Sequence, residues 1–144
     1  MARKQSAPGK KARTAHLITV TYTAGNPQPW DYQVKPPQTN PRKAKFKRGD
    51  TVKWTSPSGD WKVTFYISTP IVDGNGLGLA SISGKSGKRA GGFISQYTQP
   101  DDAFAYGVSL LLPGASQPVT DDPEIIIDSD MQKPKAKKKP KPKK

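Results

Sequence analysis

The chain has 144 residues, a formal net charge of +13 at pH 7, one histidine and no cysteine. That length suits one domain with a modest core, because only 33% of the residues are hydrophobic while 15 are proline and 13 are glycine. The absence of cysteine excludes disulfides, thiolate nucleophiles and sulfur ligands for zinc or copper, and no apolar run has the length of a membrane span.

The chain opens with a basic block, residues 1–14, which contains no acid. It is too poor in apolar residues to offset the entropy of ordering it, so we expect a disordered arm. It also lacks the apolar stretch of a secretion signal. We therefore expect an intracellular protein, in the cytoplasm or nucleoid or in a eukaryotic nucleus, with no membrane attachment. The candidate nucleic-acid contacts of this block are Arg3, Lys4, Lys10, Lys11 and Arg13.

Short segments with the two-residue period of half-buried strands follow, separated by turns rich in glycine and proline. The side chains expected to face the core are Ile18, Val20 and Tyr22 in residues 16–23; Trp30, Tyr32 and Val34 in 30–35; Val52 and Trp54 in 51–55; Trp61, Val63, Phe65 and Ile67 in 61–68; and Phe104, Tyr106, Val108 and Leu110 in 104–112. Residues 123–128 form a short apolar closing strand. This pattern predicts an all-β, antiparallel sandwich or barrel over residues 15–132. Trp54 belongs to its core, whereas Trp30 and Trp61 stand beside turns and are either packing residues or surfaces on which a base stacks.

A basic stretch in the middle of the chain, residues 42–53, holds six basic residues and one acid. It adds Arg42, Lys43, Lys45, Lys47 and Arg48 to the candidate phosphate contacts. Alternatively, these lysines protect an exposed edge strand against pairing with another sheet. Residues 101–130 hold seven of the 11 acids and no basic residue. If the two stretches lie on different faces, the domain is a charge dipole.

A glycine-rich stretch, residues 74–92, contains seven glycines, which is typical of a mobile surface loop. Its motif GKSGKRAGG differs from a nucleotide-binding phosphate loop, because five residues rather than four separate Gly78 from Gly84. The stretch nevertheless has a basic tip suited to a phosphate contact. The candidate residues of this tip are Lys85, Lys88 and Arg89.

A second basic block, residues 133–144, reads KPKAKKKPKPKK and contains no acid. Alternating lysine and proline keeps such a tail extended and disordered, and its composition resembles the tails of linker histones and other nucleoid-associated proteins. The two blocks together account for the whole net charge of +13, so residues 15–132 are neutral. A solubilising tail or a localisation sequence is the alternative interpretation. The candidate contacts are Lys133, Lys135, Lys137, Lys138, Lys139, Lys141, Lys143 and Lys144.

The segments FKRGDTVKW and GDWKVTFY resemble paired strands of the cupredoxin family, and FAYGVSLLLPGASQPVTDDPEIIID resembles the last hairpin of that family. The resemblance covers residues 45–128 and implies a Greek-key β-sandwich. A type 1 copper site uses two imidazoles and a thiolate. Trp61 stands where the resemblance implies the first histidine, and residues 109–122 contain no cysteine, histidine or methionine. We therefore expect a retained scaffold without copper, another metal or a cofactor.

No motif supports catalysis, because His16 is the only histidine and no nucleophile-elbow sequence is present. The acid pairs 101–102 and 121–122 suit a hard cation such as calcium, but more often they are solvated turn residues. We expect a non-enzymatic protein that binds DNA or RNA electrostatically, without sequence preference and with a steep salt dependence. The alternative is a metal-free cupredoxin-like module that binds a protein or another ligand, with tails that serve solubility or targeting.

Overall fold

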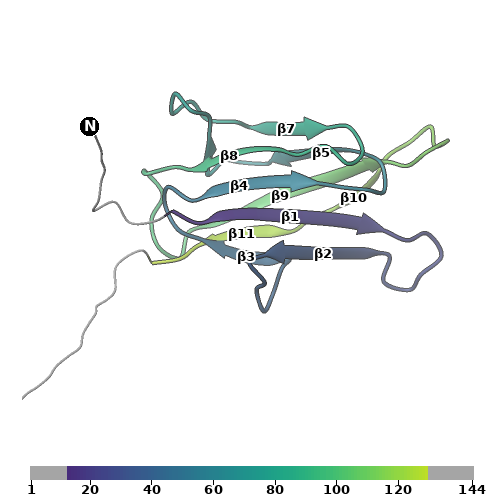
Figure 1. Cartoon of the computed structure of the whole chain (residues 1–144), viewed down its shortest axis with the longest axis horizontal. Helices are drawn as coiled ribbons and strands as arrows, with labels where there is room; N and C mark the ends of the chain where they lie inside the picture. The colour runs from purple at the N-terminus through teal and green to yellow at the C-terminus, as the bar shows by residue number, and fades with distance from the viewer. Residues whose placement is uncertain (1–12, 130–144) are drawn as a thin grey trace, which may run out of the picture.

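The computed structural model describes residues 13–129 and is a sandwich of two β-sheets (Figure 1). This confirms the predicted all-β fold. The strands are β1 (Ala15–Tyr22), β2 (Trp30–Lys35), β3 (Lys43–Phe46), β4 (Thr51–Thr55), β5 (Asp60–Phe65), β6 (Ile71–Val72), β7 (Ser81–Gly84), β8 (Ala90–Ile94), β9 (Ala103–Leu111), β10 (Val119–Asp121) and β11 (Glu124–Ile127). Within the described range there is no helix of the length and apolarity that a membrane crossing requires.

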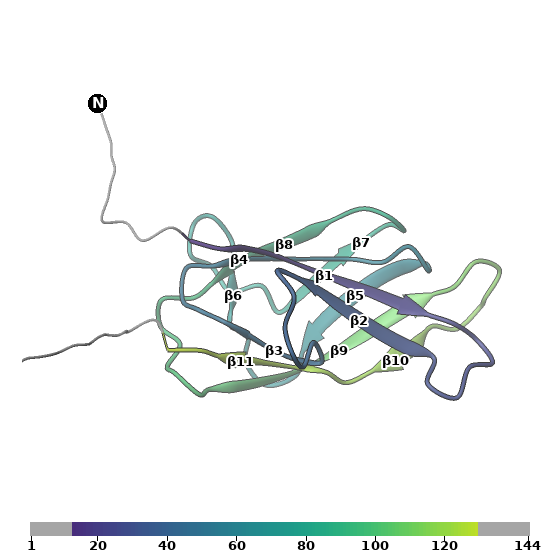
Figure 2. The ribbon, with the colours of Figure 1, turned by 60° about the horizontal axis from the view of Figure 1, so that its bottom comes forward.

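The sheets are formed by strands that alternate between the two layers. Sheet A has the order β2-β1-β4-β8-β6 and sheet B the order β3-β11-β9-β5-β7, with β10 also paired to β9. Figure 2 shows β4 and β8 of sheet A lying over β9 and β11 of sheet B. The chain changes sheet at every connection from β2 to β9. Strands remote in sequence therefore become neighbours, and two pairs, β1–β4 and β3–β11, are parallel within largely antiparallel sheets.

The core contains nearly all of the side chains that the alternating pattern assigns to it. Those that are buried are Ile18, Val20, Tyr32, Val34, Val52, Trp54, Trp61, Val63, Phe65, Tyr106, Val108 and Leu110, while Tyr22, Trp30 and Phe104 are partly buried against them. Ile67 is 99% exposed, so its assignment to the core is wrong. The reason is that β5 ends at Phe65, which is the last residue of that strand to pair with β9.

An aromatic cluster joins the two sheets at the centre of the core. The ring of Tyr106 in β9 lies 5.7 Å from that of Trp54 in β4 and 5.2 Å from that of Phe65 in β5, measured between ring centroids. The Trp54 indole N–H also donates to the Tyr106 hydroxyl at 3.4 Å. Such tilted and edge-on contacts add to the stabilisation from burial alone. Trp54 is therefore a core residue, as predicted.

The return strand of the last hairpin begins at Val119, before the predicted start at residue 123. The register with β9 runs without a shift from Val119 opposite Leu110 to Ile126 opposite Ala103. The strand is divided into β10 and β11 at Pro123, which has no N–H to donate to the ladder. β10 and β11 are thus one return strand of the hairpin.

The glycine-rich stretch is not a single loop, because β7 and β8 run through it. Gly91 pairs with Lys53 of β4, and a Cβ at this position would lie 1.9 Å from the Val52 carbonyl oxygen. Glycine is needed there for close packing of two strands rather than for mobility. The prediction of a mobile loop over residues 74–92 is therefore wrong for both strands.

Candidate functional site

The turn between β3 and β4 holds the start of β1. Asp50 ends this turn, and its carboxylate accepts hydrogen bonds from the backbone N–H groups of Thr14 at 3.2 Å and Lys47 at 3.0 Å. It also accepts one from His16 Nε2 at 2.8 Å, where the two side chains are 9% and 8% exposed. The Thr14 carbonyl accepts from the Thr51 N–H at 3.0 Å. Thr14, expected in the basic arm, thus bonds to the sandwich on both sides.

The surroundings of Asp50 favour its ionised form. Burial acts to raise its pKa, but the hydrogen bonds from His16 and from the two backbone N–H groups outweigh burial and hold the pKa of Asp50 below its ordinary value. The His16 ring lies 4.6 Å from that of Phe46, and its Nδ1 is buried without a hydrogen-bond partner. His16 therefore contributes packing on one side and a single hydrogen bond on the other.

The same turn also holds the other end of the described chain. The N–H of Asp128 donates to the Phe46 carbonyl at 2.8 Å, directly after β11. Both ends of the described chain therefore lie at the same end of the sandwich (Figure 1), and the basic blocks are attached there. Arg13 is described and exposed. The other predicted contacts of the blocks lie outside the described residues: Arg3, Lys4, Lys10, Lys11, Lys133, Lys135, Lys137, Lys138, Lys139, Lys141, Lys143 and Lys144.

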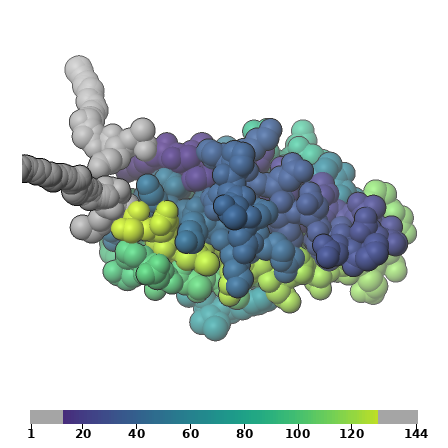
Figure 3. Space-filling model, turned by 90° about the horizontal axis from the view of Figure 1, so that it is seen from below, coloured from purple at the N-terminus to yellow at the C-terminus, as the bar shows by residue number. Residues whose placement is uncertain are grey.

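The start of the basic stretch 42–53 lies beside the end of the acidic stretch 101–130 and not on a different face. β3 and β11 pair in parallel, with Lys43 opposite Glu124, and Lys43 Nζ lies 3.9 Å from the Glu124 carboxylate. The Arg42 guanidinium makes two hydrogen bonds to the carboxylate of Asp121. Figure 3 shows the blue residues of the β2–β3 region next to the yellow residues at the end of the described chain. The two stretches therefore do not lie on different faces at this point, where Arg42 and Lys43 are paired with acids of the second stretch.

Asp121 is the centre of a small polar network. It accepts a hydrogen bond from the Tyr32 hydroxyl at 2.9 Å, and the Arg42 guanidinium lies 5.3 Å from the centroid of the Tyr32 ring. Burial acts to raise the pKa of Asp121, but the hydrogen bonds from Arg42 and Tyr32 outweigh it, so this pKa lies below its ordinary value. Burial, followed by the contact with Asp121, raises the pKa of Tyr32 far above its usual range. The Arg42 side chain is exposed, but its guanidinium is paired with Asp121 and is therefore less available to a phosphate than an unpaired cation.

The basic stretch continues along an edge strand and into the turn that follows it. β3 is the outermost strand of sheet B, as the alternative interpretation of its lysines requires. Lys45 and Lys47 are exposed, and neither forms an ion pair with another described residue. The Arg48 guanidinium lies 3.5 Å from the carbonyl oxygen of Thr98. Of the five predicted contacts in this stretch, Lys45 and Lys47 present the most accessible charge.

The predicted basic tip is a turn between β7 and β8 that is fastened to the core. The indole N–H of Trp61 donates to the Lys88 carbonyl at 3.0 Å, and the Lys85 ammonium lies 3.6 Å from the Asp60 carboxylate. The side chains of Lys88 and Arg89 are exposed and form no ion pair with a described residue. The tip therefore offers two unpaired cations on an anchored backbone.

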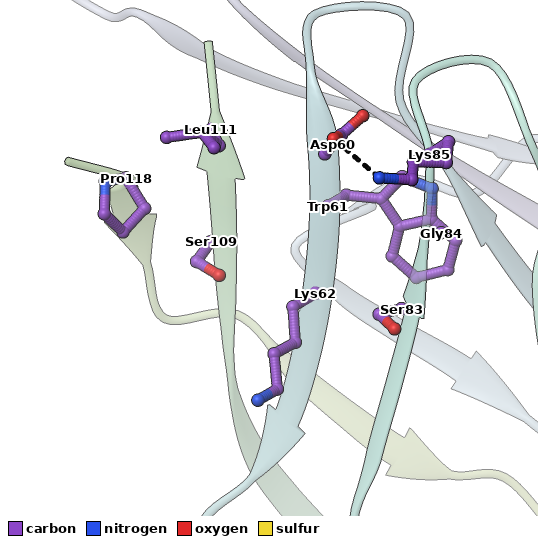
Figure 4. A pocket seen from close by; sticks show the side chains of 9 residues that line it. All are labelled: Asp60, Trp61, Lys62, Ser83, Gly84, Lys85, Ser109, Leu111 and Pro118. Atoms are coloured by element: carbon purple, nitrogen blue, oxygen red, sulfur yellow. Dashed lines mark ion pairs between the residues drawn. The ribbon is translucent and has the colours of Figure 1, made fainter. Parts of the chain in front are cut away.

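A hollow of about 350 Å³ opens on sheet B beside this turn (Figure 4). The only carboxylate in its lining, Asp60, is paired with Lys85. The Trp61 ring, 3% exposed, is turned toward Gly84, where a Cβ would lie 2.8 Å from it. Trp61 is thus a packing residue and not an exposed surface on which a base could stack. Within residues 13–129, no group of three or more His, Asp and Glu side chains is placed to hold a metal ion.

A basic groove crosses the outer face of sheet A, and the sequence analysis missed it. Lys35 of β2 and Lys53 of β4 stand on either side of Leu17 of β1, because the strand register pairs Leu17 with both. Arg89, the residue before β8, lines the same groove, which has a volume of about 670 Å³. No carboxylate lines it, and none of its three cations forms an ion pair with a described residue.

No protein-family model matches the chain, and no curated protein is similar to it in sequence. The roles of residues therefore rest on the charges, contacts and burial in this chain. On that basis the described residues offer unpaired cations in two main places. One is the β3 edge, with Lys45 and Lys47, and the other is the groove on sheet A, with Lys35, Lys53 and Arg89.

Proposed function

We propose that the protein binds nucleic acid without catalysing a reaction, through electrostatic contacts to phosphates that do not depend on base sequence. The observation that carries the proposal is the segregation of charge along the chain. Residues 1–14 and 133–144 contain no acid and together account for the net charge of +13. Lysine and arginine side chains that neutralise phosphates release condensed counterions, and this release supplies the affinity of nonspecific complexes.

The fold supports the proposal through the place at which the two blocks join it. Asp50 binds the N–H of Thr14, and Phe46 binds that of Asp128, so the blocks are attached on either side of one turn. Two basic segments attached at one place act on the same stretch of nucleic acid, because binding of one raises the local concentration of the other. Lys45 lies on the strand that enters this turn, Lys47 follows directly after that strand, and both extend the positive surface.

We further infer that the sandwich is of the cupredoxin type and has no copper site. The segments that carry the resemblance form β4, β5 and the β9–β10–β11 hairpin, which together contribute much of the core. Trp61 fills the position of the first expected ligand and is used for packing. In this interpretation the sandwich is not an electron carrier but a scaffold for the basic segments. The protein then acts in a compartment that contains nucleic acid.

The proposal is tested by fluorescence anisotropy with the full chain and labelled duplex and single-stranded DNA and RNA over a series of salt concentrations. The matched variant replaces all eight lysines of residues 133–144 with glutamine. If each lysine neutralises one phosphate, the slope of log affinity against log salt on duplex DNA falls by about 7. A full chain that binds none of these probes near physiological salt overturns the proposal.

One observation favours a second candidate, a protein-interaction module. Ile67 and Tyr97 are 99% and 93% exposed, on the β5–β6 and β8–β9 loops. These loops are joined by a hydrogen bond from the Ser95 N–H to the Pro70 carbonyl at 2.8 Å. Two exposed apolar side chains on neighbouring loops are candidates for a protein contact. On this reading, I67S and Y97S weaken binding of a protein partner, while the lysine-to-glutamine variant retains it.

A further inference from the structure

The outer face of sheet A combines positive charge with a regular spacing. Lys35, Leu17 and Lys53 stand in one row across β2, β1 and β4. Neighbouring strands lie about 4.8 Å apart, so the backbones at the two lysines are roughly 10 Å apart. Nucleotides in one strand of a duplex rise by about 3.4 Å each, so this distance corresponds to about three of them. Gly91 of β8 pairs with Lys53 and so continues this row. Arg89 lies two residues before Gly91 and therefore on the same face, because side chains alternate along a strand.

None of the three cations on this face is paired within the described part of the protein. Lys35, Lys53 and Arg89 form no ion pair with a described residue, whereas Arg42, Lys43 and Lys85 elsewhere on the sandwich each lie next to a carboxylate. The groove between the three cations has no acidic lining residue. Its complement is therefore a ligand with several negative charges spaced along its length, as in a phosphodiester chain.

An aromatic side chain lies on the same face. Phe93 of β8 pairs with Thr51 of β4 and is 38% exposed. Between Phe93 and Arg89 stands Gly91, which has no side chain and pairs with Lys53. A positively charged surface with an exposed aromatic ring is typical of proteins that bind single strands, whose bases stack on such rings. The major groove of a duplex instead admits a helix or a two-stranded ribbon, and the middle of a five-stranded sheet is neither.

We propose that the outer face of sheet A binds single-stranded nucleic acid, with Lys35, Lys53 and Arg89 on phosphates of one strand and a base stacked on Phe93. This inference rests on the proposed function and names the surface of the folded domain that carries part of it. Ala15, which also lines the groove, follows directly after the first basic block. A strand that crosses sheet A toward the start of β1 therefore reaches the basic block.

The test uses the full chain and a fluorescein-labelled twelve-nucleotide oligothymidylate, with a twelve-base-pair duplex as the second probe. The face variant is K35Q/K53Q/R89Q. The matched control is K43Q/K62Q/K85Q, which removes the same charge from exposed residues outside sheet A, two of which, Lys43 and Lys85, are paired with carboxylates. F93L removes the aromatic ring and retains an apolar side chain. Circular dichroism and urea unfolding establish that each variant is folded.

The face variant is expected to bind the oligothymidylate about tenfold more weakly, with a salt slope reduced by about 2, since three single-strand phosphate contacts are lost. The control changes affinity by less than about threefold, because exposed charges away from the strand are largely screened. F93L weakens binding of the oligothymidylate about fivefold or more and leaves the salt slope and duplex binding unchanged.

Each of the other outcomes contradicts one named part of the proposal. Equal losses in the face variant and the control refute the groove on sheet A while the proposed function stands. Tighter binding of the duplex, together with no effect of F93L, refutes the assignment to single strands. A wild-type chain that binds neither probe near physiological salt refutes the proposed function itself.

Discussion

Arg42 and Asp121 lie 79 residues apart in the sequence and are joined by two hydrogen bonds. Tyr32 donates its hydroxyl proton to the same carboxylate, so three segments of the chain meet at one acid. A residue that belongs to the most basic stretch of the domain thus forms an ion pair that joins segments far apart in the sequence. The distinction between paired and unpaired cations leads to the first prediction.

R42Q is expected to lower the free energy of unfolding by about 1 kcal/mol, because it removes a charge-assisted pair that is only partly screened by solvent. Its affinity for a single-stranded oligonucleotide should change less than about twofold. K53Q should give the opposite result, a loss of affinity with unchanged stability, since Lys53 has no ion-pair partner among the described residues. Urea unfolding and anisotropy on both variants check this, and the reverse ordering contradicts it.

D50N is expected to destabilise the protein by about 2 kcal/mol, because the carboxylate accepts from His16 and two backbone N–H groups in a buried turn. The control is D31N, since Asp31 is exposed and surface substitutions of this kind change stability by less than about 0.5 kcal/mol. Urea unfolding at pH 7 compares the two. Equal effects of D50N and D31N would contradict the role given to the turn.

Stability is expected to fall in acid. Asp50 and Asp121 have pKa values below their ordinary range in the folded protein, so the unfolded chain binds protons more readily than the folded one. The contribution of the two acids is complete above the ordinary carboxyl pKa of about 4 and is lost as pH falls through the folded values. Urea unfolding between pH 7 and pH 2 should show this decline. The D50N variant should show a smaller one.

G91A is expected to destabilise the protein by about 3 kcal/mol or more, because a Cβ there would lie 1.9 Å from the Val52 carbonyl oxygen and β4 and β8 would have to separate. The matched control is G74A in the same glycine-rich stretch, where a Cβ would meet nothing within 4 Å. Thermal unfolding of both variants decides between tight packing and mobility as the reason for Gly91. A large effect at both positions would contradict tight packing as the reason for Gly91.

A chain of residues 13–129 is expected to fold by itself, with a thermal midpoint within about 4 °C of the full chain, which corresponds to less than about 1 kcal/mol. The hydrogen bonds that hold its ends, from Thr14 to Asp50 and from Asp128 to Phe46, are all retained. A chain that starts at Leu17 loses Thr14 and His16 and should melt at a clearly lower temperature. Equal midpoints for the two shortened chains would show that the β3–β4 turn does not stabilise the start of β1.

The strand faces were predictable from sequence because alternation of side chains is a local property. Val52 and Trp54 in β4, or Tyr106 and Val108 in β9, follow the period of two wherever the strand is regular. Ile67 follows the same period and is exposed, because the end of a strand is set by its partner. β7 and β8 escaped prediction, since their glycines are typical of loops and only their neighbours make glycine necessary.

The groove on sheet A illustrates what pairing adds. In sequence, Lys35 and Lys53 are single lysines on the outer faces of two strands, with no shared motif. They become one site because β1 pairs with both β2 and β4, one antiparallel and one parallel. The same effect placed Arg42 next to Asp121, so a basic stretch and an acidic stretch that suggested two faces became neighbours. Local composition therefore predicted where charge lies along the chain, but not which charged residues become neighbours across the sheets.

The hydrogen bond from Trp61 to the Lys88 carbonyl has a consequence for Arg89, the next residue. A side chain on a free segment loses backbone freedom when it binds, and that loss opposes association. The indole has already immobilised the turn, so this part of the entropy was lost on folding. Each phosphate contact made by Arg89 should therefore contribute more to affinity than one made by a lysine on an unanchored segment. In that sense Trp61, a packing residue of sheet B, preorganises a cation at the rim of sheet A.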